Sequence, residues 1–387
     1  AQPEEVGLSS AALARLSQAL KDRIASGHIP GAVALVARHG KVAHFEALGA
    51  RDPASGAPMG LDSIFRIYSM TKPITSVAAM SLFEEGRLML GDPVSKYVPE
   101  FVQTTAGVVR GGDIVRVPLD RPVTVQDLLR HTSGLTYEFR GATPIHKAYM
   151  AARVMRLKQT NEDQARELAA LPLLYQPGAK WEYSRSTDVL GRVVEVVSGQ
   201  TLGAFLKDRV LGPLGMEDAA FTVPERDHGR IAEAFAKDPE NGTDVALLDV
   251  KRTALFESGG GGLAATTMDY ARFLAMLLGS GKLGETRILG RKTVELMTSD
   301  HLGRIEGDGD LLPPGHGFGL GFAVRTSSGM SPFPGSLGNY YWGGAAGTTF
   351  WVDPSERLFA VLMIQAPVQR EHYRLMFRNM VYAAIAD

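Results

Sequence analysis

The chain has 387 residues, of which 45% are hydrophobic and 21% are charged, and it contains 43 Gly, 21 Pro and no Cys. This composition is typical of a globular protein and excludes a disordered, collagenous or coiled-coil protein, while the lack of Cys excludes disulfides and a thiol nucleophile. The 41 Lys and Arg residues nearly balance the 42 Asp and Glu residues, and no apolar run approaches ~20 residues, so neither nucleic-acid binding nor a membrane span is expected.

The first third of the chain mixes helical and strand patterns. Leucines at helical spacing and two β-rich runs joined at His39-Gly40 indicate a helix followed by a hairpin. The expected elements are a helix over 9–26, strands over 31–38, 41–48 and 64–68, and a helix over 69–85. The start of the chain, Ala1 to Glu5, lacks the basic and apolar regions of a signal peptide. This favours a cytoplasmic location, with a periplasmic or secreted one open if a leader precedes Ala1.

The middle of the chain, residues 96–224, has a different pattern of apolar residues. Short apolar clusters separated by Gly- and Pro-containing loops favour helices, and no stretch with strand periodicity stands out. The expected helices lie around 128–129, 168–174 and 189–197, with loops at Gly111-Gly112, Gly141 and Pro177-Gly178. We therefore expect a mainly helical domain.

The last third returns to strands. A strand over 257–264 is expected to lead into a helix that begins with a capping box between Thr266 and Asp269. Further strands are expected over 318–324, 348–352 and 358–364, with a closing helix over 370–386. This order predicts an α/β (α+β) fold in which segments 1–95 and 225–387 form one split domain around an antiparallel sheet flanked by helices. The mainly helical domain of residues 96–224 faces it across a cleft.

Several weaker signals have simpler explanations. The run Gly259 to Ala264 matches a dinucleotide-binding pattern, but four consecutive glycines satisfy it trivially, and close approach of a strand is favoured. The histidines lack metal-ligand spacing, so structural or surface roles are favoured for His131, His228, His301 and His316. Neither a metal nor a cofactor is expected.

The segment Ser69-Met70-Thr71-Lys72 contains a candidate catalytic pair. Positions i and i+3 share a helix face, so the Lys72 ammonium can reach the Ser69 hydroxyl. A serine needs an adjacent base to become a nucleophile, and a buried lysine with a lowered pKa can act as one. Pro73 places the start of the helix near Ser69, where the helix dipole stabilises an anion. By itself the pattern is common, and a capping serine with a solvated lysine is about as plausible.

Two further motifs shift the balance: Tyr183 in the run 177–184, and Tyr341 followed by Trp342-Gly343-Gly344-Ala345. With supporting stretches at 128–135, 259–263 and 317–322, the chain resembles the serine β-lactamase and penicillin-binding-protein superfamily over nearly its whole length. Within it, the chain is most similar to the family VIII carboxylesterases, which look like class C β-lactamases.

The resemblance implies a β-lactamase-like fold with a site in the cleft between two domains. It implies catalysis by Ser69, Lys72 and Tyr183, with either Lys72 or Tyr183 as the base, and an oxyanion hole formed by the backbone N–H groups of Ser69 and Ala345. Substrate is expected to contact Trp342, Gly343 and Gly344, and Tyr137 is either a further cleft residue or a packing residue.

Two departures from the lactamase pattern bear on the substrate. Trp342 stands where a lysine is usual, and an apolar wall favours a neutral ester over a carboxylate-bearing substrate. Arg185 stands where class C enzymes have Asn; it either pairs elsewhere, which is favoured, or restores a cation near the cleft.

We therefore expect a serine carboxylesterase that hydrolyses short-chain carboxylic esters, a small-molecule substrate, through an acyl-enzyme. A β-lactamase or D-Ala-D-Ala carboxypeptidase, an acyltransferase, and a non-catalytic ligand sensor are the alternatives. The sequence does not determine the oligomeric state.

Overall fold

A computed structural model describes residues 1–156, 158–307 and 309–387. It is built around an eight-stranded sheet in the order β10-β11-β12-β13-β14-β1-β2-β3, whose neighbours pair antiparallel. These strands are β1 (Gly31–Arg38), β2 (Lys41–Asp52), β3 (Ala57–Pro58), β10 (His316–Phe318), β11 (Ala323–Arg325), β12 (Tyr340–Gly343), β13 (Thr349–Asp353) and β14 (Leu358–Ile364). The sheet confirms the predicted fold class.

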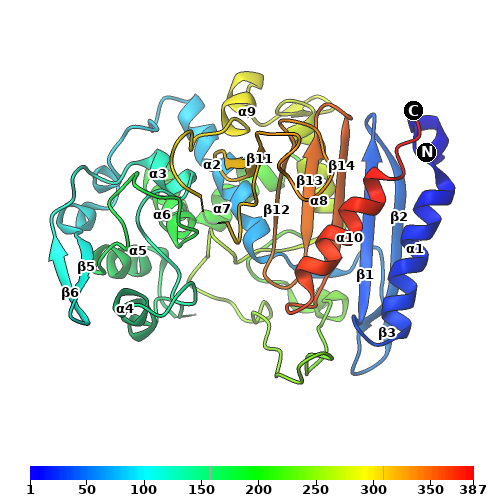
Figure 1. Cartoon of the computed structure of the whole chain (residues 1–387), viewed down its shortest axis with the longest axis horizontal. Coiled ribbons are helices and arrows are strands. Elements are labelled where there is room, and N and C mark those ends of the chain that lie inside the picture. The colour runs from blue at the N-terminus through cyan, green and yellow to red at the C-terminus, as the bar shows by residue number, and fades with distance from the viewer. Residues whose placement is uncertain (157, 308) are drawn as a thin grey trace.

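The two ends of the chain meet in this sheet. All eight residues of β1 and all seven of β14 are buried, and the strands pair from Ala32 opposite Ile364 to Arg38 opposite Leu358. Both faces of the sheet are covered, which is why these strands are apolar without alternation. The two termini also lie side by side (Figure 1), where Ser9 N donates to the Ala384 carbonyl at 2.7 Å.

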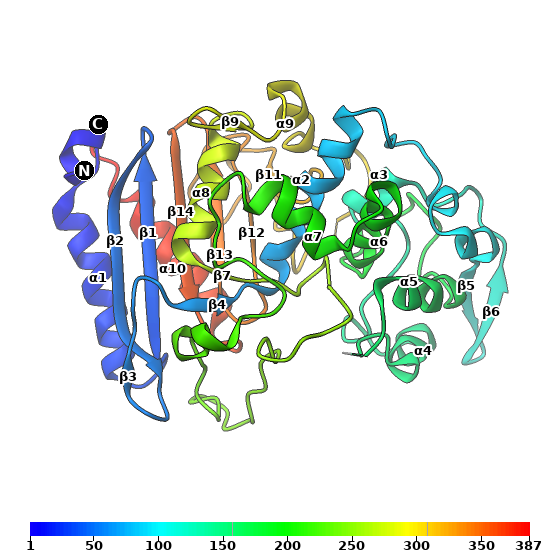
Figure 2. The same ribbon diagram turned by 180° about the vertical axis from the view of Figure 1, so that it is seen from behind.

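Helices cover the sheet on both faces. On one face lie α1 (Ser10–Ala25) and α10 (Arg370–Tyr382), and on the other lie α2 (Thr71–Glu84) and α8 (Thr267–Leu278) (Figures 1 and 2). The capping box predicted for α8 is present, with Thr266 and Asp269 each accepting a hydrogen bond from the other's backbone. The closing helix ends at Tyr382, four residues earlier than expected.

Most of the remaining helices lie at the end of the molecule away from α1 (Figure 1). They are α3 (Val125–Leu129), α4 (Pro144–Ala152), α5 (Asn161–Ala170), α6 (Ser186–Ser198) and α7 (Leu202–Leu206), while α9 (Arg291–Met297) lies above α2. Within the described ranges no single helix is both long and apolar enough to cross a membrane; the segments Ser186–Ser198 and Leu202–Leu211, bent by 77°, meet that test only as a pair.

The expectation of no strands in the middle of the chain is wrong. Strands β5 (Ala106–Arg110) and β6 (Asp113–Val117) form a hairpin whose turn is Gly111-Gly112. Both glycines have positive φ, 59° and 94°, as a two-residue hairpin turn requires. The helix expected over 168–174 ends at Ala170, because the residue before Pro172 disfavours helical geometry.

Two expected strands of the last third also differ. The strand expected over 318–324 is split into β10 and β11 by a turn at Gly321, whose φ is 102°. The strand expected over 257–264 is a loop up to β7 (Ala264–Thr266), which pairs with β4 (Ile64–Arg66). A further short pair, β8 (Lys282–Leu283) and β9 (Thr286–Arg287), follows α8.

Candidate functional site

Ser69 and Lys72 lie where a strand gives way to a helix. A 3₁₀ turn, η2 (Tyr68–Met70), carries the half-buried Ser69 and runs directly into α2. Lys72 Nζ donates to Ser69 Oγ at 3.2 Å, the contact that the i, i+3 spacing predicts. Tyr68 has a φ of 42°, a left-handed conformation uncommon outside glycine, and its hydroxyl accepts a hydrogen bond from Leu248 N at 2.7 Å.

The Lys72 ammonium is buried, with 1% of the residue exposed. Besides Ser69 it donates to the Tyr137 hydroxyl at 2.9 Å and to the Gly260 carbonyl at 2.6 Å. No carboxylate in the described ranges forms an ion pair with it. Burial alone lowers the pKa of Lys72, but the oxygens of Tyr137 and Tyr183 more than offset this, and the net shift is upward. The direction of this shift is opposite to the lowered pKa expected for a lysine base.

The loop before β7 supplies the carbonyl that accepts from Lys72. Asp188 on α6 accepts from Gly260 N at 2.9 Å and from the Ser258 hydroxyl at 2.6 Å, and so fixes this loop. The Gly259 carbonyl accepts from Thr75 Oγ1 at 2.9 Å. A Cβ on Gly259 would lie 2.7 Å from the Thr187 carbonyl oxygen. The consecutive glycines thus serve close backbone approach, as predicted, but in a loop whose carbonyls bind side chains of α2.

Tyr183 lies over the lysine and against Trp342. Lys72 Nζ is 4.5 Å from the centroid of the Tyr183 ring, and Trp342 Nε1 donates to the Tyr183 hydroxyl at 3.1 Å. Tyr183 and Trp342 are 8% and 7% exposed. Trp342, expected as an apolar wall, therefore also supplies a hydrogen-bond donor. His131 packs 4.9 Å from the Tyr183 ring, and burial, reinforced by the charge of Lys72, lowers the pKa of His131 well below its usual range.

Tyr137 contacts both Lys72 and Tyr183. Burial raises the pKa of Tyr137 to about 12 despite the nearby Lys72 charge, so its phenol stays protonated near neutral pH. The Arg185 guanidinium lies 4.6 Å from the centre of its ring. Arg185 is paired with Glu138 at 2.6 Å and with Asp188 at 3.5 Å. Of the two roles open for Arg185, the geometry therefore matches pairing elsewhere.

Gly343 ends β12 and Gly344 follows it beside the nucleophile segment. A Cβ on Gly344 would lie 2.4 Å from the Ile67 carbonyl oxygen, two residues before Ser69. A Cβ on Gly343 would lie 2.7 Å from Arg374 Cζ, so a side chain at position 343 would displace the guanidinium. In the part of the chain that the structure describes, the backbone N–H groups of Ser69 and Ala345 have no acceptor, which leaves both available to a ligand.

The structure thus brings five side chains together from η2, α2, the loops before α4 and α6, and β12: Ser69, Lys72, Tyr137, Tyr183 and Trp342. Sequence reasoning missed the contacts of the Gly260 carbonyl, Asp188 and Arg374. The run of glycines was a signal for the Gly260 contact, whereas nothing in the sequence pattern singles out Asp188 or Arg374.

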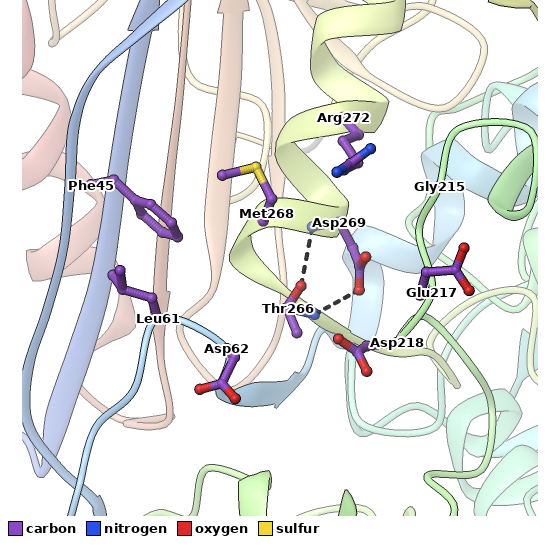
Figure 3. Close-up of a pocket in the computed structure, with 10 residues that line it drawn as sticks. All are labelled: Phe45, Leu61, Asp62, Gly215, Glu217, Asp218, Thr266, Met268, Asp269 and Arg272. Carbon is purple, nitrogen blue, oxygen red and sulfur yellow. Dashed lines mark hydrogen bonds between the residues drawn. The ribbon is translucent and has the colours of Figure 1, made fainter. Parts of the chain in front are cut away.

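A cavity of about 330 Å³ lies elsewhere and shares no residue with this site (Figure 3). It is lined on one side by Phe45, Leu61 and Met268 and on the other by acidic side chains that include Asp269. Burial raises the pKa of Asp269 to about 6, although the Thr266 hydrogen bonds oppose the shift.

Comparisons with known proteins identify the family and the fold. The Beta-lactamase family model matches residues 16–384. Esterase EstB of Burkholderia gladioli is 33% identical over 382 residues, covering 93% of this chain and 92% of EstB. Protein Rv1367c of Mycobacterium tuberculosis is 38% identical over 350 residues, covering 88% of this chain and 86% of that protein.

Among solved structures, EstCE1, described as a hydrolase with promiscuous acyltransferase activity, superposes with a TM-score of 0.81 at 29% identity, covering 96% of this chain and 99% of EstCE1. The predicted resemblance is therefore confirmed at the level of the family.

Proposed function

The chain belongs to the Beta-lactamase family of serine hydrolases, and from that premise we propose that it is a carboxylesterase of the family VIII type, with Ser69 as its nucleophile. The observation that carries the proposal is the buried Lys72 ammonium, which donates to Ser69 Oγ and has no carboxylate partner in the described ranges. A buried cation without a counter-ion stabilises an anion that forms beside it. The serine alkoxide and the tetrahedral oxyanion are such anions.

In the proposed reaction, Tyr183 is the proton acceptor and Lys72 stays protonated. The upward pKa shift of Lys72 argues against it as the base, and the high pKa of Tyr137 argues for a neutral phenol there. Tyr183 remains, with the Trp342 N–H aimed at its oxygen, where a donor stabilises negative charge. The phenolate takes the Ser69 proton as Oγ forms its bond to the ester carbonyl carbon.

The tetrahedral intermediate then collapses. Its oxyanion accepts hydrogen bonds from the Ser69 and Ala345 N–H groups, and each such donor typically contributes on the order of 10²–10³ in rate. The Tyr183 phenol returns its proton to the departing alkoxide, and the C–O bond breaks to leave the alcohol and the acyl-enzyme. Water attacks the acyl-enzyme and gives a proton to Tyr183, which passes it to Ser69 as the acid leaves.

Two observations favour esters over β-lactams or peptides. EstB, an esterase, aligns with nearly the whole chain. Trp342 also offers no permanent charge to a substrate carboxylate, and the nearby Arg185 is occupied by Glu138 and Asp188. We propose short-chain acyl esters as the substrates. Acyl transfer to an alcohol is a second candidate, which the relationship to EstCE1 supports.

The proposal is tested by parallel assays of the wild type and Ser69→Ala on p-nitrophenyl butyrate and on a chromogenic cephalosporin. An ester rate that is lost in Ser69→Ala, with negligible cephalosporin turnover, is expected. The opposite ratio identifies a β-lactamase, and an ester rate unchanged in Ser69→Ala refutes the nucleophile assignment. Repeating the ester assay with added butanol, and measuring butyl butyrate against butyrate, separates transfer from hydrolysis.

A further inference from the structure

Arg374, on α10, reaches the end of the hairpin formed by β12 and β13. Its Nη2 donates to the Gly344 carbonyl and lies 3.5 Å from the Thr348 carbonyl oxygen, while Nη1 is paired with Glu371 at 2.5 Å. The guanidinium lies against Gly343, where a Cβ would be 2.7 Å from Cζ. Only a glycine at position 343 therefore allows this arginine to reach the carbonyl of the next residue.

The Gly344 carbonyl belongs to the same peptide unit as the Ala345 N–H. Because the unit is planar and trans, its carbonyl and its N–H point in opposite directions. Two donors, Arg374 and the Gly347 N–H at 3.0 Å, hold the carbonyl on one side. The Ala345 N–H is thereby turned to the other side, where it meets no acceptor in the described ranges.

The end of this hairpin is also packed against the nucleophile segment. The Gly344 Cα faces the Ile67 carbonyl, and the Thr348 hydroxyl donates to the same oxygen at 3.4 Å. The hairpin end is thus packed on the residues that lead into Ser69, whose own N–H also has no acceptor there. A cation on the far oxygen of the peptide also polarises the amide, which makes its N–H a stronger donor.

We propose that Arg374 is a positioning residue of the oxyanion hole, which fixes and polarises the Gly344–Ala345 peptide so that the Ala345 N–H binds the oxyanion of a substrate attached to Ser69. This rests on the proposed nucleophile but not on the choice of ester over β-lactam. A guanidinium suits the task because its planar fork binds the carbonyl and Glu371 at once, which a lysine ammonium does less rigidly.

The test compares Arg374→Gln and Arg374→Lys with Arg370→Gln. Arg370 is the matched control because it lies one turn earlier on α10, is 42% exposed, and contacts the carbonyls of Pro367 and Ala345 without touching the Gly344 carbonyl. Each variant is assayed for kcat and KM on p-nitrophenyl butyrate. Its affinity for phenylboronic acid, which forms a tetrahedral anion on the serine, is measured by calorimetry.

We expect Arg374→Gln to lower kcat by about 10- to 100-fold with little change in KM, and to weaken boronate binding by a similar factor. Arg374→Lys recovers part of both, and Arg370→Gln changes neither. If Arg374 has only a structural role, Arg374→Gln loses stability but its kcat and its boronate affinity do not fall together. Unchanged boronate affinity in Arg374→Gln therefore overturns the proposal, whatever the kcat of the variant. If Arg374→Gln does not fold, wild-type boronate affinity in Arg374→Lys overturns it equally. Boronate binding by a wild type that hydrolyses no ester separates failure of the esterase assignment from failure of this proposal.

Discussion

Replacement of Trp342 by Phe isolates the hydrogen bond that the tryptophan donates to Tyr183. The variant keeps an aromatic ring in the cluster, where Trp342 packs 5.1 Å from Tyr183 and 5.4 Å from Phe318, but it removes the N–H 3.1 Å from the phenol oxygen. A hydrogen bond to a charged oxygen contributes about 1.5–3 kcal/mol, and one to a neutral oxygen about 0.5–1.5 kcal/mol. Loss of the bond therefore disfavours the Tyr183 phenolate, the proposed proton acceptor, relative to the phenol by the difference of about 1–1.5 kcal/mol. With ~1.36 kcal/mol per factor of ten, kcat/KM is expected to fall by about 5- to 13-fold.

Trp181→Phe is the matched control for the lost ring area. Trp181 lies in the same cluster, is 2% exposed, and its indole N–H has no partner in the described ranges, so its replacement is expected to cost only a few-fold in kcat/KM. The assay is steady-state hydrolysis of p-nitrophenyl butyrate by both variants, by Tyr183→Phe and by the double variant of positions 183 and 342. We expect Trp342→Phe to add little in the Tyr183→Phe background, because the acceptor is already gone. Equal losses in the two backgrounds, or a loss no larger than that of Trp181→Phe, would refute the reasoning.

Three further predictions concern single groups of the structure. Tyr137→Phe removes the hydroxyl that accepts from Lys72 and is expected to lower kcat/KM by about tenfold, less than Tyr183→Phe does; a larger loss than in Tyr183→Phe would make Tyr137 the proton acceptor. Arg185→Met strands the buried Asp188 carboxylate and is expected to lower the free energy of unfolding by about 3–5 kcal/mol in urea titrations, whereas a change under about 1 kcal/mol would show that the pair is dispensable. Folding raises the pKa of Asp269 from 3.8 to about 6, so between these values the folded state holds the extra proton and stability falls as pH rises. Asp269→Asn is expected to remove this pH-dependent loss in the free energy of unfolding, on the order of 2–3 kcal/mol, when urea titrations at pH 4.5 and 7 are compared. If the variant loses as much stability as the wild type between the two pH values, Asp269 does not have the raised pKa.

The sequence by itself determined the features that depend on residues close together in the chain. The contact between Ser69 and Lys72 follows from residues three apart on one helical turn, and the capping box at Thr266 follows from four consecutive residues. The apolar runs that become β1 and β14 were likewise predictable, because strands buried on both faces are mostly apolar. One wrong prediction arose where backbone groups bind side chains instead of a neighbouring strand. The glycines from 259 onward read as a strand, yet their carbonyls accept from Thr75 and Lys72.

Only the tertiary structure decided which hydrogen-bond donor around Lys72 pairs with which acceptor. Tyr183 could be singled out by its motif, but the phenol that accepts from Lys72 is that of Tyr137, and Tyr183 accepts from Trp342 instead. The partners of Arg185 and the reach of Arg374 to Gly344 were equally undetermined by the sequence pattern. The physical reason is that a buried polar group must find a partner wherever packing places one, and packing joins segments far apart in the chain. Which donor meets which acceptor is therefore a property of the folded molecule.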